Sequence, residues 1–79
     1  MHIVYSLQSV KEPERYYVGL TTDAAYRLDI HNRGEVFHTA KWRPWKLVVE
    51  IRFADEQKAI AFERYLKSGS GRAFAKRHF

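Results

Sequence analysis

The sequence predicts an α+β fold, a small α/β sandwich in which a three-stranded antiparallel sheet is flanked by helices. The predicted order is strand, strand, helix, strand, helix, helix. Strand-like patterns occupy three segments, and residues that cap helices follow the second and third of them. The connection between the first two strands is short, which favours antiparallel pairing. With 79 residues and no long linker, the chain is predicted to form a single domain, 1–79, with one small core.

Three segments carry the strand-like patterns: residues 2–7, 16–20 and 46–53. The first segment alternates, with three side chains on one face: Ile3, Tyr5 and Leu7. The second is rich in aromatic and β-branched residues and follows a charged turn that contains Pro13. The third alternates again and is expected to place four apolar side chains on one face: Leu47, Val49, Ile51 and Phe53.

The first predicted helix begins after the second strand. Thr21 or Thr22 can cap it, with Asp23 favourable in its first turn, and Gly34 ends it. Its buried side is expected to comprise Ala24, Ala25 and Leu28. Residues 35–45 show no period and predict a loop.

The second predicted helix is capped by Asp55 and runs to about Lys67. The glycine- and serine-rich segment 68–71 breaks it, and residues 72–78 predict a short basic helix.

Composition favours a polyanionic partner. Lysine and arginine together number 14 against 9 acidic residues, and the formal charge of +5 gives a pI near 9.7. The alternative is a basic protein without such a partner. No cysteine is present, which excludes disulfides and thiolate zinc sites. No apolar run is long enough to span a membrane, so we expect no membrane association and a cytoplasmic protein.

Glu63 is the most unusual residue of the second predicted helix, because it interrupts an apolar face. Its apolar neighbours on a helical wheel are Ala59, Ile60, Phe62 and Leu66. A carboxylate in such a position is costly unless it is paired or binds a metal ion. Two interpretations are therefore open: a metal ligand, or a boundary residue paired with Lys67 four positions on.

A second set of polar residues lies in the first half of the chain. Arg27 and His31 are four residues apart and share a helix face, and an arginine fork suits a phosphate. Tyr5 and Tyr17 lie on adjacent predicted strands, and Gly19 follows Tyr17 on the same face, where it allows close approach of a ligand or of backbone. The alternative is a solvated helix face beside ordinary strand tyrosines.

The loop before the third strand interleaves aromatic and basic side chains, a composition that can stack on bases and neutralise phosphates. Its candidate nucleic-acid-binding residues are Lys41, Trp42 and Arg43, and candidates elsewhere are Gly19, Lys67 and Arg72. The alternative is that Phe37 and Trp45 are core side chains beneath the loop. Of the two tryptophans, we expect Trp45 in the core, and Trp42 is the better candidate for exposure.

These residues, in this order, resemble the motifs of the GIY-YIG nuclease superfamily, specifically its small stand-alone single-domain members. Ile3-Val4-Tyr5 corresponds to the first motif, with Ile3 in place of its glycine, and Tyr17-Val18-Gly19 to the second. Arg27, the pair His31-Asn32 and Glu63 fit the remaining positions. Each motif is weak alone, but the ordered set covers nearly the whole chain.

The resemblance implies metal-dependent hydrolysis of phosphodiester bonds in DNA, duplex or branched. Glu63 would ligate one divalent ion, Mg²⁺ or Mn²⁺, and Arg27 would stabilise charge on the pentacoordinate phosphate. Tyr17 would be the general base or would orient the attacking water. Tyr5 and His31 would hold the phosphate or the water, and His31 could also relay a proton.

The residues leave the identity of the base open. A tyrosine, with a pKa near 10, is ionised in only about one molecule in a thousand at pH 7. Either a cation, Arg27 or the metal ion, lowers the pKa of the tyrosine, or His31 takes the proton and Tyr17 only orients the water.

The chain also departs from some family members, because the stretch Leu20-Thr21-Thr22 lacks their lysine. No appended DNA-binding domain is expected. Such a module is predicted to cut with low sequence specificity, or to rely on a protein partner that supplies specificity; its oligomeric state is open.

Two other functions remain as alternatives. One is a nucleic-acid-binding module that has kept the fold without turnover, which would bind in a salt-sensitive manner. The other is a protein-interaction module that uses residues 37–45 as an apolar contact patch.

Overall fold

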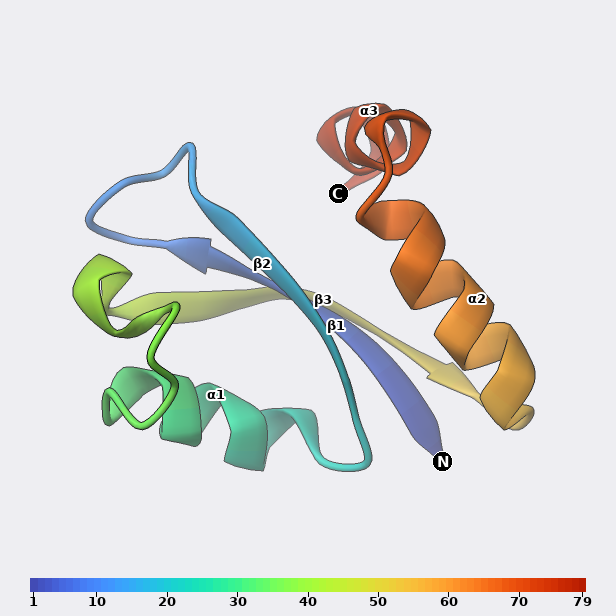
Figure 1. Cartoon of the computed structure of the whole chain (residues 1–79), viewed down its shortest axis with the longest axis horizontal. Coiled ribbons are helices and arrows are strands. Elements are labelled where there is room, and N and C mark those ends of the chain that lie inside the picture. The colour runs from blue at the N-terminus through green and yellow to red at the C-terminus, as the bar shows by residue number, and fades with distance from the viewer.

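The computed structural model describes residues 1–79, and its sheet has the strand order β2-β1-β3 with both pairs antiparallel. Figure 1 shows α1 on one side of this sheet and α2 with α3 on the other. The elements are β1 (His2–Ser9), β2 (Tyr16–Thr21), α1 (Ala24–Asn32), the 3₁₀ turn η1 (Ala40–Trp42), β3 (Trp45–Phe53), α2 (Glu56–Leu66) and α3 (Gly69–His78). The predicted fold class and element order are confirmed.

Two hydrophobic clusters lie on opposite faces of the central strand. The cluster beneath α1 contains Ile3, Tyr5, Leu7, Ala24 and Trp45. The cluster beneath α2 and α3 contains Val4, Ala59 and Leu66, with Phe62 and Phe74 packed against it. Because side chains alternate along a strand and both faces of β1 are covered, consecutive residues of β1 are buried in different clusters. No helix is long and apolar enough to cross a membrane.

The predicted alternation of β3 is wrong at one residue. Ser6 pairs with Val49 but Leu7 pairs with Leu47, so β3 carries one extra residue, Val48, at this point. This bulge turns Leu47 to the same face as Leu7, away from the face of Val49. Leu47 lies on β3, at the edge of the sheet, and is 37% exposed.

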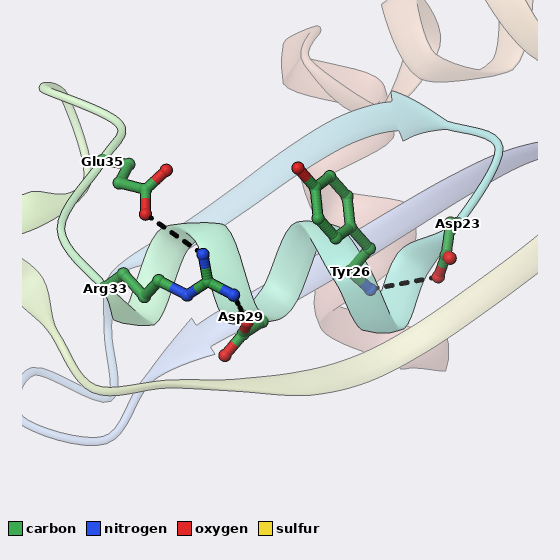
Figure 2. Close-up of polar contacts among 5 residues, drawn as sticks. All are labelled: Asp23, Tyr26, Asp29, Arg33 and Glu35. Carbon is green, nitrogen blue, oxygen red and sulfur yellow. Dashed lines mark hydrogen bonds and ion pairs between the residues drawn. The ribbon is translucent and has the colours of Figure 1, made fainter.

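The start of α1 also differs from the prediction. Asp23, rather than a threonine, is its N-cap, and the Asp23 carboxylate accepts a hydrogen bond from the Tyr26 amide at 3.0 Å (Figure 2). The Thr21 hydroxyl instead accepts from the Asp23 amide at 3.1 Å and supports the turn. Gly34 follows the helix with a φ of +80°, a conformation that suits glycine, so the predicted end is confirmed.

The junction of α2 and α3 is tighter than expected. Ser68 caps α3 by accepting from the Gly71 amide at 3.1 Å, so α3 begins at Gly69 rather than at Arg72. A Cβ at Gly71 would lie 1.7 Å from the carbonyl oxygen of Tyr65. Only glycine therefore lets the first turn of α3 pack against the end of α2.

Candidate active site

Tyr5 and Gly19 form the centre of the site. They are directly opposite each other on β1 and β2, and the Tyr5 ring lies across the backbone of Gly19. A Cβ at Gly19 would lie 2.5 Å from both Cζ and Oη of Tyr5. The glycine expected to allow a close approach is thus confirmed as such, and the approaching group is the Tyr5 side chain.

A buried hydrogen-bond chain starts at the Tyr5 hydroxyl. Tyr5 Oη lies 3.1 Å from Nε2 of His31, and Nδ1 of His31 lies 2.8 Å from the Thr39 hydroxyl. Thr39 Oγ1 is itself 3.3 Å from the Val36 carbonyl oxygen. His31 is fully buried, and Tyr5 and Thr39 are nearly so. Both ring nitrogens of His31 therefore have partners and are shielded from solvent.

These hydrogen bonds fix the tautomer of His31. The Thr39 hydroxyl donates to the Val36 carbonyl, so its oxygen is left to accept a hydrogen bond from Nδ1–H. The unprotonated Nε2 then accepts from the Tyr5 hydroxyl. Burial, followed by the positive charge of Arg27, lowers the pKa of His31 below its usual 6.5. The imidazole is neutral at pH 7.

Arg27 faces the Tyr5 hydroxyl from α1. Burial raises the pKa of Tyr5 above its usual 10, and the nearby Arg27 guanidinium partly opposes that rise by hydrogen bonding. The same interaction with Tyr5 raises the pKa of Arg27. Tyr5 therefore stays a neutral phenol that donates to His31 and holds Arg27 by its oxygen.

Arg33, the other arginine of this region, has different surroundings. It forms ion pairs with Asp29 and, at 3.4 Å, with Glu35 on the outer side of α1 (Figure 2). Its positive charge is thus balanced by two carboxylates. Of the two arginines, Arg27 alone faces the tyrosines.

Tyr17 completes the group on the α1 face of the sheet. Its ring centroid lies 4.7 Å from that of His31 and 6.2 Å from that of Tyr5. Its hydroxyl forms no hydrogen bond within the chain, and no buried side-chain polar atom lacks a partner, so this hydroxyl is exposed to solvent. Tyr17 is the one phenol of the pair that can contact a water molecule or a substrate directly.

Glu63 lies on α2, across the sheet from α1. Its side chain is 17% exposed, and one of its carboxylate oxygens is 2.6 Å from the Lys67 ammonium. The pairing with Lys67 that the sequence offered as an alternative is therefore present. Lys67 also connects Glu63 to the tyrosines, because its charge acts on the Tyr5 hydroxyl and it lines one groove together with Tyr17.

Glu63 is the carboxylate that this site could offer to a metal ion. No group of three or more histidine, cysteine, aspartate or glutamate side chains gathers anywhere in the chain. A lone carboxylate is nevertheless a hard oxygen ligand, and Mg²⁺ is commonly held by one or two carboxylates with substrate phosphates and waters. Glu63 fits such an ion only together with a bound phosphate.

The loop residues proposed for nucleic-acid binding are engaged within the protein. Trp42 is more exposed than Trp45, as expected, but its ring is half-buried against the cluster beneath α1. Arg15 lies 4.0 Å and Lys41 5.0 Å from its ring centroid. Arg43 donates from Nε to the Ala40 carbonyl at 2.7 Å and packs over the backbone at Gly34.

Trp45 and Phe37, the two aromatic residues that could lie in the core beneath this loop, differ in burial. Trp45 is buried, as expected, and its indole nitrogen donates to the Thr39 carbonyl at 2.9 Å. Phe37, by contrast, is 89% exposed and is not a core side chain. The other two residues proposed from the sequence, Lys67 and Arg72, line one groove at the opposite side of β2.

Sequence reasoning missed Thr39, which orients His31. Its only signal in the sequence is a position eight residues after the histidine within an aperiodic loop. Asn32, which follows His31, has a structural role: its amide oxygen accepts from the Trp45 amide at 2.6 Å and its amide nitrogen donates to the Trp45 carbonyl at 3.0 Å. These bonds fasten the end of α1 to the start of β3.

A comparison with protein-family models assigns the chain. The model described as the GIY-YIG catalytic domain matches residues 1–77. The chain belongs to the GIY-YIG family. The family inferred from the sequence is thus confirmed, and with it the assignment to a class of nuclease enzymes.

Individual relatives agree with this GIY-YIG assignment. The structure-specific endonuclease subunit SLX1 of Debaryomyces hansenii is 34% identical over 71 residues, covering 81% of this chain and 20% of that protein. Its namesake in Candida dubliniensis is 38% identical over 71 residues, with 81% and 25% covered. A UPF0213 protein of Streptococcus pneumoniae is 42% identical over 53 residues, with 66% and 54% covered. The chain spans about a fifth to a half of the length of these relatives.

Proposed function

We propose that this protein is a metal-dependent DNA endonuclease that hydrolyses phosphodiester bonds and recognises the DNA backbone with little sequence preference. The observation that carries the proposal is the cluster of Tyr5, Tyr17, Arg27 and His31 within a GIY-YIG catalytic domain. A buried histidine fixed through both nitrogens, beside an arginine and an exposed phenol, is costly for the fold and suits a reaction at a phosphate.

Arg27 is proposed to bind the scissile phosphate. Its guanidinium is positioned by the Tyr5 oxygen and is not neutralised by a carboxylate, unlike that of Arg33. Such a fork can donate to two phosphate oxygens at once, and its charge counts most as negative charge grows on the pentacoordinate phosphorus.

Tyr17 is proposed to orient the attacking water, because its hydroxyl is the exposed one. A proton can reach His31 only through the Tyr5 hydroxyl, which is bonded to Nε2. In that relay the Tyr5 oxygen would take a proton from water as its own proton moves to Nε2. The lowered pKa of His31 makes this imidazole a weak proton acceptor and the relay less favourable, so we assign Tyr5 and His31 to positioning Arg27 and Tyr17.

Glu63 is the residue proposed to hold one divalent ion, Mg²⁺ or Mn²⁺. When bound, such an ion supplies positive charge at the phosphate and lowers the pKa of a bound water. Glu63 can bind this ion only if Lys67 moves away from the carboxylate oxygen with which it pairs, or if the other carboxylate oxygen of Glu63 binds the ion. The Lys67 side chain is 52% exposed, so it can turn from Glu63 toward a phosphate.

DNA is the proposed substrate, duplex or branched, and a protein partner is proposed to supply specificity. The basic charge of +5 supports a polyanionic substrate. The SLX1 relatives are named as subunits of structure-specific endonucleases, which supports both a partner and recognition of DNA shape.

The test is nicking of supercoiled plasmid with Mg²⁺ or Mn²⁺, with a chelator as the blank. Arg27→Ala and Glu63→Gln are expected to lower the rate at least a hundredfold, on the scale of losing one charged group from a reaction centre. The matched controls are Arg33→Ala, at the C-cap of the helix that carries Arg27, and Glu56→Gln, on the same helix as Glu63; both should nick at the wild-type rate. Equal rates in all five proteins would reject the assignment.

One observation favours the second function, a non-catalytic nucleic-acid-binding module. The Glu63 carboxylate is occupied by Lys67, and it belongs to no group of three or more acidic, cysteine or histidine side chains. Salt-sensitive DNA binding without metal-dependent nicking by the wild type would select this function.

A further inference from the structure

A groove runs along the outer side of β2, on the face of the sheet opposite α1. It has a volume of about 890 Å³ and is bounded by the loop before β2, the strand itself, the end of α2 and the inner side of α3. In Figure 1 that loop and α3 project on either side of β2. The catalytic proposal uses only one end of this groove.

The groove is strongly basic. Its charged lining residues are Arg15, Lys67, Arg72, Lys76 and one acidic residue, Glu14. Arg72 and Lys76 are four residues apart on α3, so one helix face presents both. Neither forms an ion pair within the chain, which leaves both charges available to a polyanion.

An exposed aromatic ring stands in the same groove. Tyr16 is 58% exposed, yet its hydroxyl is held by the Gln8 amide, which donates to it at 3.1 Å. The same amide nitrogen of Gln8 donates to the Pro13 carbonyl at 2.8 Å. Tyr16 is therefore a fixed platform and not a freely rotating surface side chain.

The groove shares two residues with the candidate active site and its surroundings. Tyr17 lines it, and its ring is also the one that contacts His31. Lys67 lines it as well and pairs with Glu63. A DNA strand whose scissile phosphate lies at Arg27 can therefore continue past Tyr17 into the groove.

We propose that this groove binds a single-stranded segment of DNA next to the scissile phosphate. The proposal rests on the function proposed above and adds the path of the strand. The cations neutralise successive phosphates, and the Tyr16 ring stacks on a base. The faces of bases inside a duplex are already stacked on one another, so this ring selects an unpaired base. The groove thereby favours DNA with a single-stranded branch.

The test is binding of a fluorescent twelve-nucleotide oligo(dT), followed by anisotropy, in a chelator so that no cleavage occurs. Tyr16→Ala is expected to weaken binding roughly tenfold, the scale of one lost base–aromatic stack. Tyr16→Phe keeps the ring and is expected to bind like the wild type within about twofold. Arg72→Ala and Lys76→Ala should each reduce the slope of log K against log salt by about 0.7, one phosphate contact on a single strand.

Matched controls lie outside the groove. Phe37→Ala removes a ring that is even more exposed, and Arg52→Ala removes an equal charge from β3 at the other edge of the sheet. Both should bind oligo(dT) as the wild type does. Circular dichroism and thermal melts of each variant verify that it is folded.

The proposal is overturned if the wild type does not bind oligo(dT), or if Tyr16→Ala binds it as the wild type does. It is also overturned if Phe37→Ala and Arg52→Ala weaken binding as much as the groove variants, or if Tyr16→Ala weakens a blunt duplex equally. Plasmid nicking is read separately. Groove-dependent binding without nicking would reject the nuclease alone, and nicking without groove-dependent binding would reject the strand path alone.

Discussion

Replacing Gly19 by alanine tests the geometry at the centre of the site. The new Cβ would lie 2.5 Å from Cζ and Oη of Tyr5 and 2.7 Å from Cε1. Tyr5 is 1% exposed and its ring is packed in the cluster beneath α1, so it has no free space into which to turn. Either the ring or the backbone of β2 must move.

The expected cost follows from these contacts. Overpacking a core by one methyl group costs about 1–3 kcal/mol. Displacing the Tyr5 hydroxyl from His31 forfeits a hydrogen bond worth about 0.5–1.5 kcal/mol more. We therefore expect Gly19→Ala to lower the free energy of unfolding by about 2–4 kcal/mol. In a domain of this size each kcal/mol lowers the melting temperature by about 4–8 °C.

The assay is urea unfolding followed by far-ultraviolet circular dichroism, together with plasmid nicking below the melting temperature. The matched control is Gly69→Ala, because a Cβ at Gly69 meets nothing within 4 Å. In the first turn of α3 this change should be neutral or stabilising by up to about 1 kcal/mol. If Gly19→Ala proves as stable as Gly69→Ala and nicks plasmid at the wild-type rate, the close contact with Tyr5 does not constrain the site.

Other predictions concern the supports of the site. Thr39→Val leaves Nδ1 of His31 without its acceptor and should destabilise the fold by about 1–3 kcal/mol in urea, while Thr39→Ser should stay near the wild type. Burial first, and the charge of Arg27 second, lower the pKa of His31 below 6.5, so the unfolded chain binds more protons there. Stability is therefore expected to fall as the pH drops from about 6.5 through the lowered pKa; urea unfolding at about pH 7.5 and 5.5 measures this, and a loss undiminished in His31→Gln would contradict it. Gly71→Ala places a Cβ 1.7 Å from a backbone oxygen of α2, so α3 must shift, and a melting temperature within about 4 °C of the wild type would reject that packing.

Much of the fold followed from local patterns. Strand alternation and a short turn identified β1 and β2, and Gly34 identified the end of α1. The predicted start of α1 differed from the observed one because three neighbouring polar residues can all cap a helix. Only the backbone geometry selects Asp23. The bulge in β3 could not be predicted from the alternating sequence. The extra residue is defined only by how β3 pairs with β1, and the sequence of β3 alone does not indicate it.

The candidate site was predicted in part. The motif positions singled out Tyr5, Tyr17, Arg27 and His31, and the structure brings these four together. Exposure in the loop was predicted only in part, because composition does not show which aromatic ring packs inward. Trp42 is half-buried against the cluster beneath α1, whereas Phe37, whose core role was the alternative interpretation, lies in solvent.

By itself the sequence determined the fold class, the family and the residue types of the site, because periodicity, capping and ordered motifs are local properties of the chain. Only the tertiary structure decided that Thr39 fixes the tautomer of His31, that Tyr5 needs Gly19, and that a basic groove meets the site at Tyr17. Each of these depends on contacts between residues on different elements. Such contacts follow from strand pairing and helix packing, which no local pattern specifies.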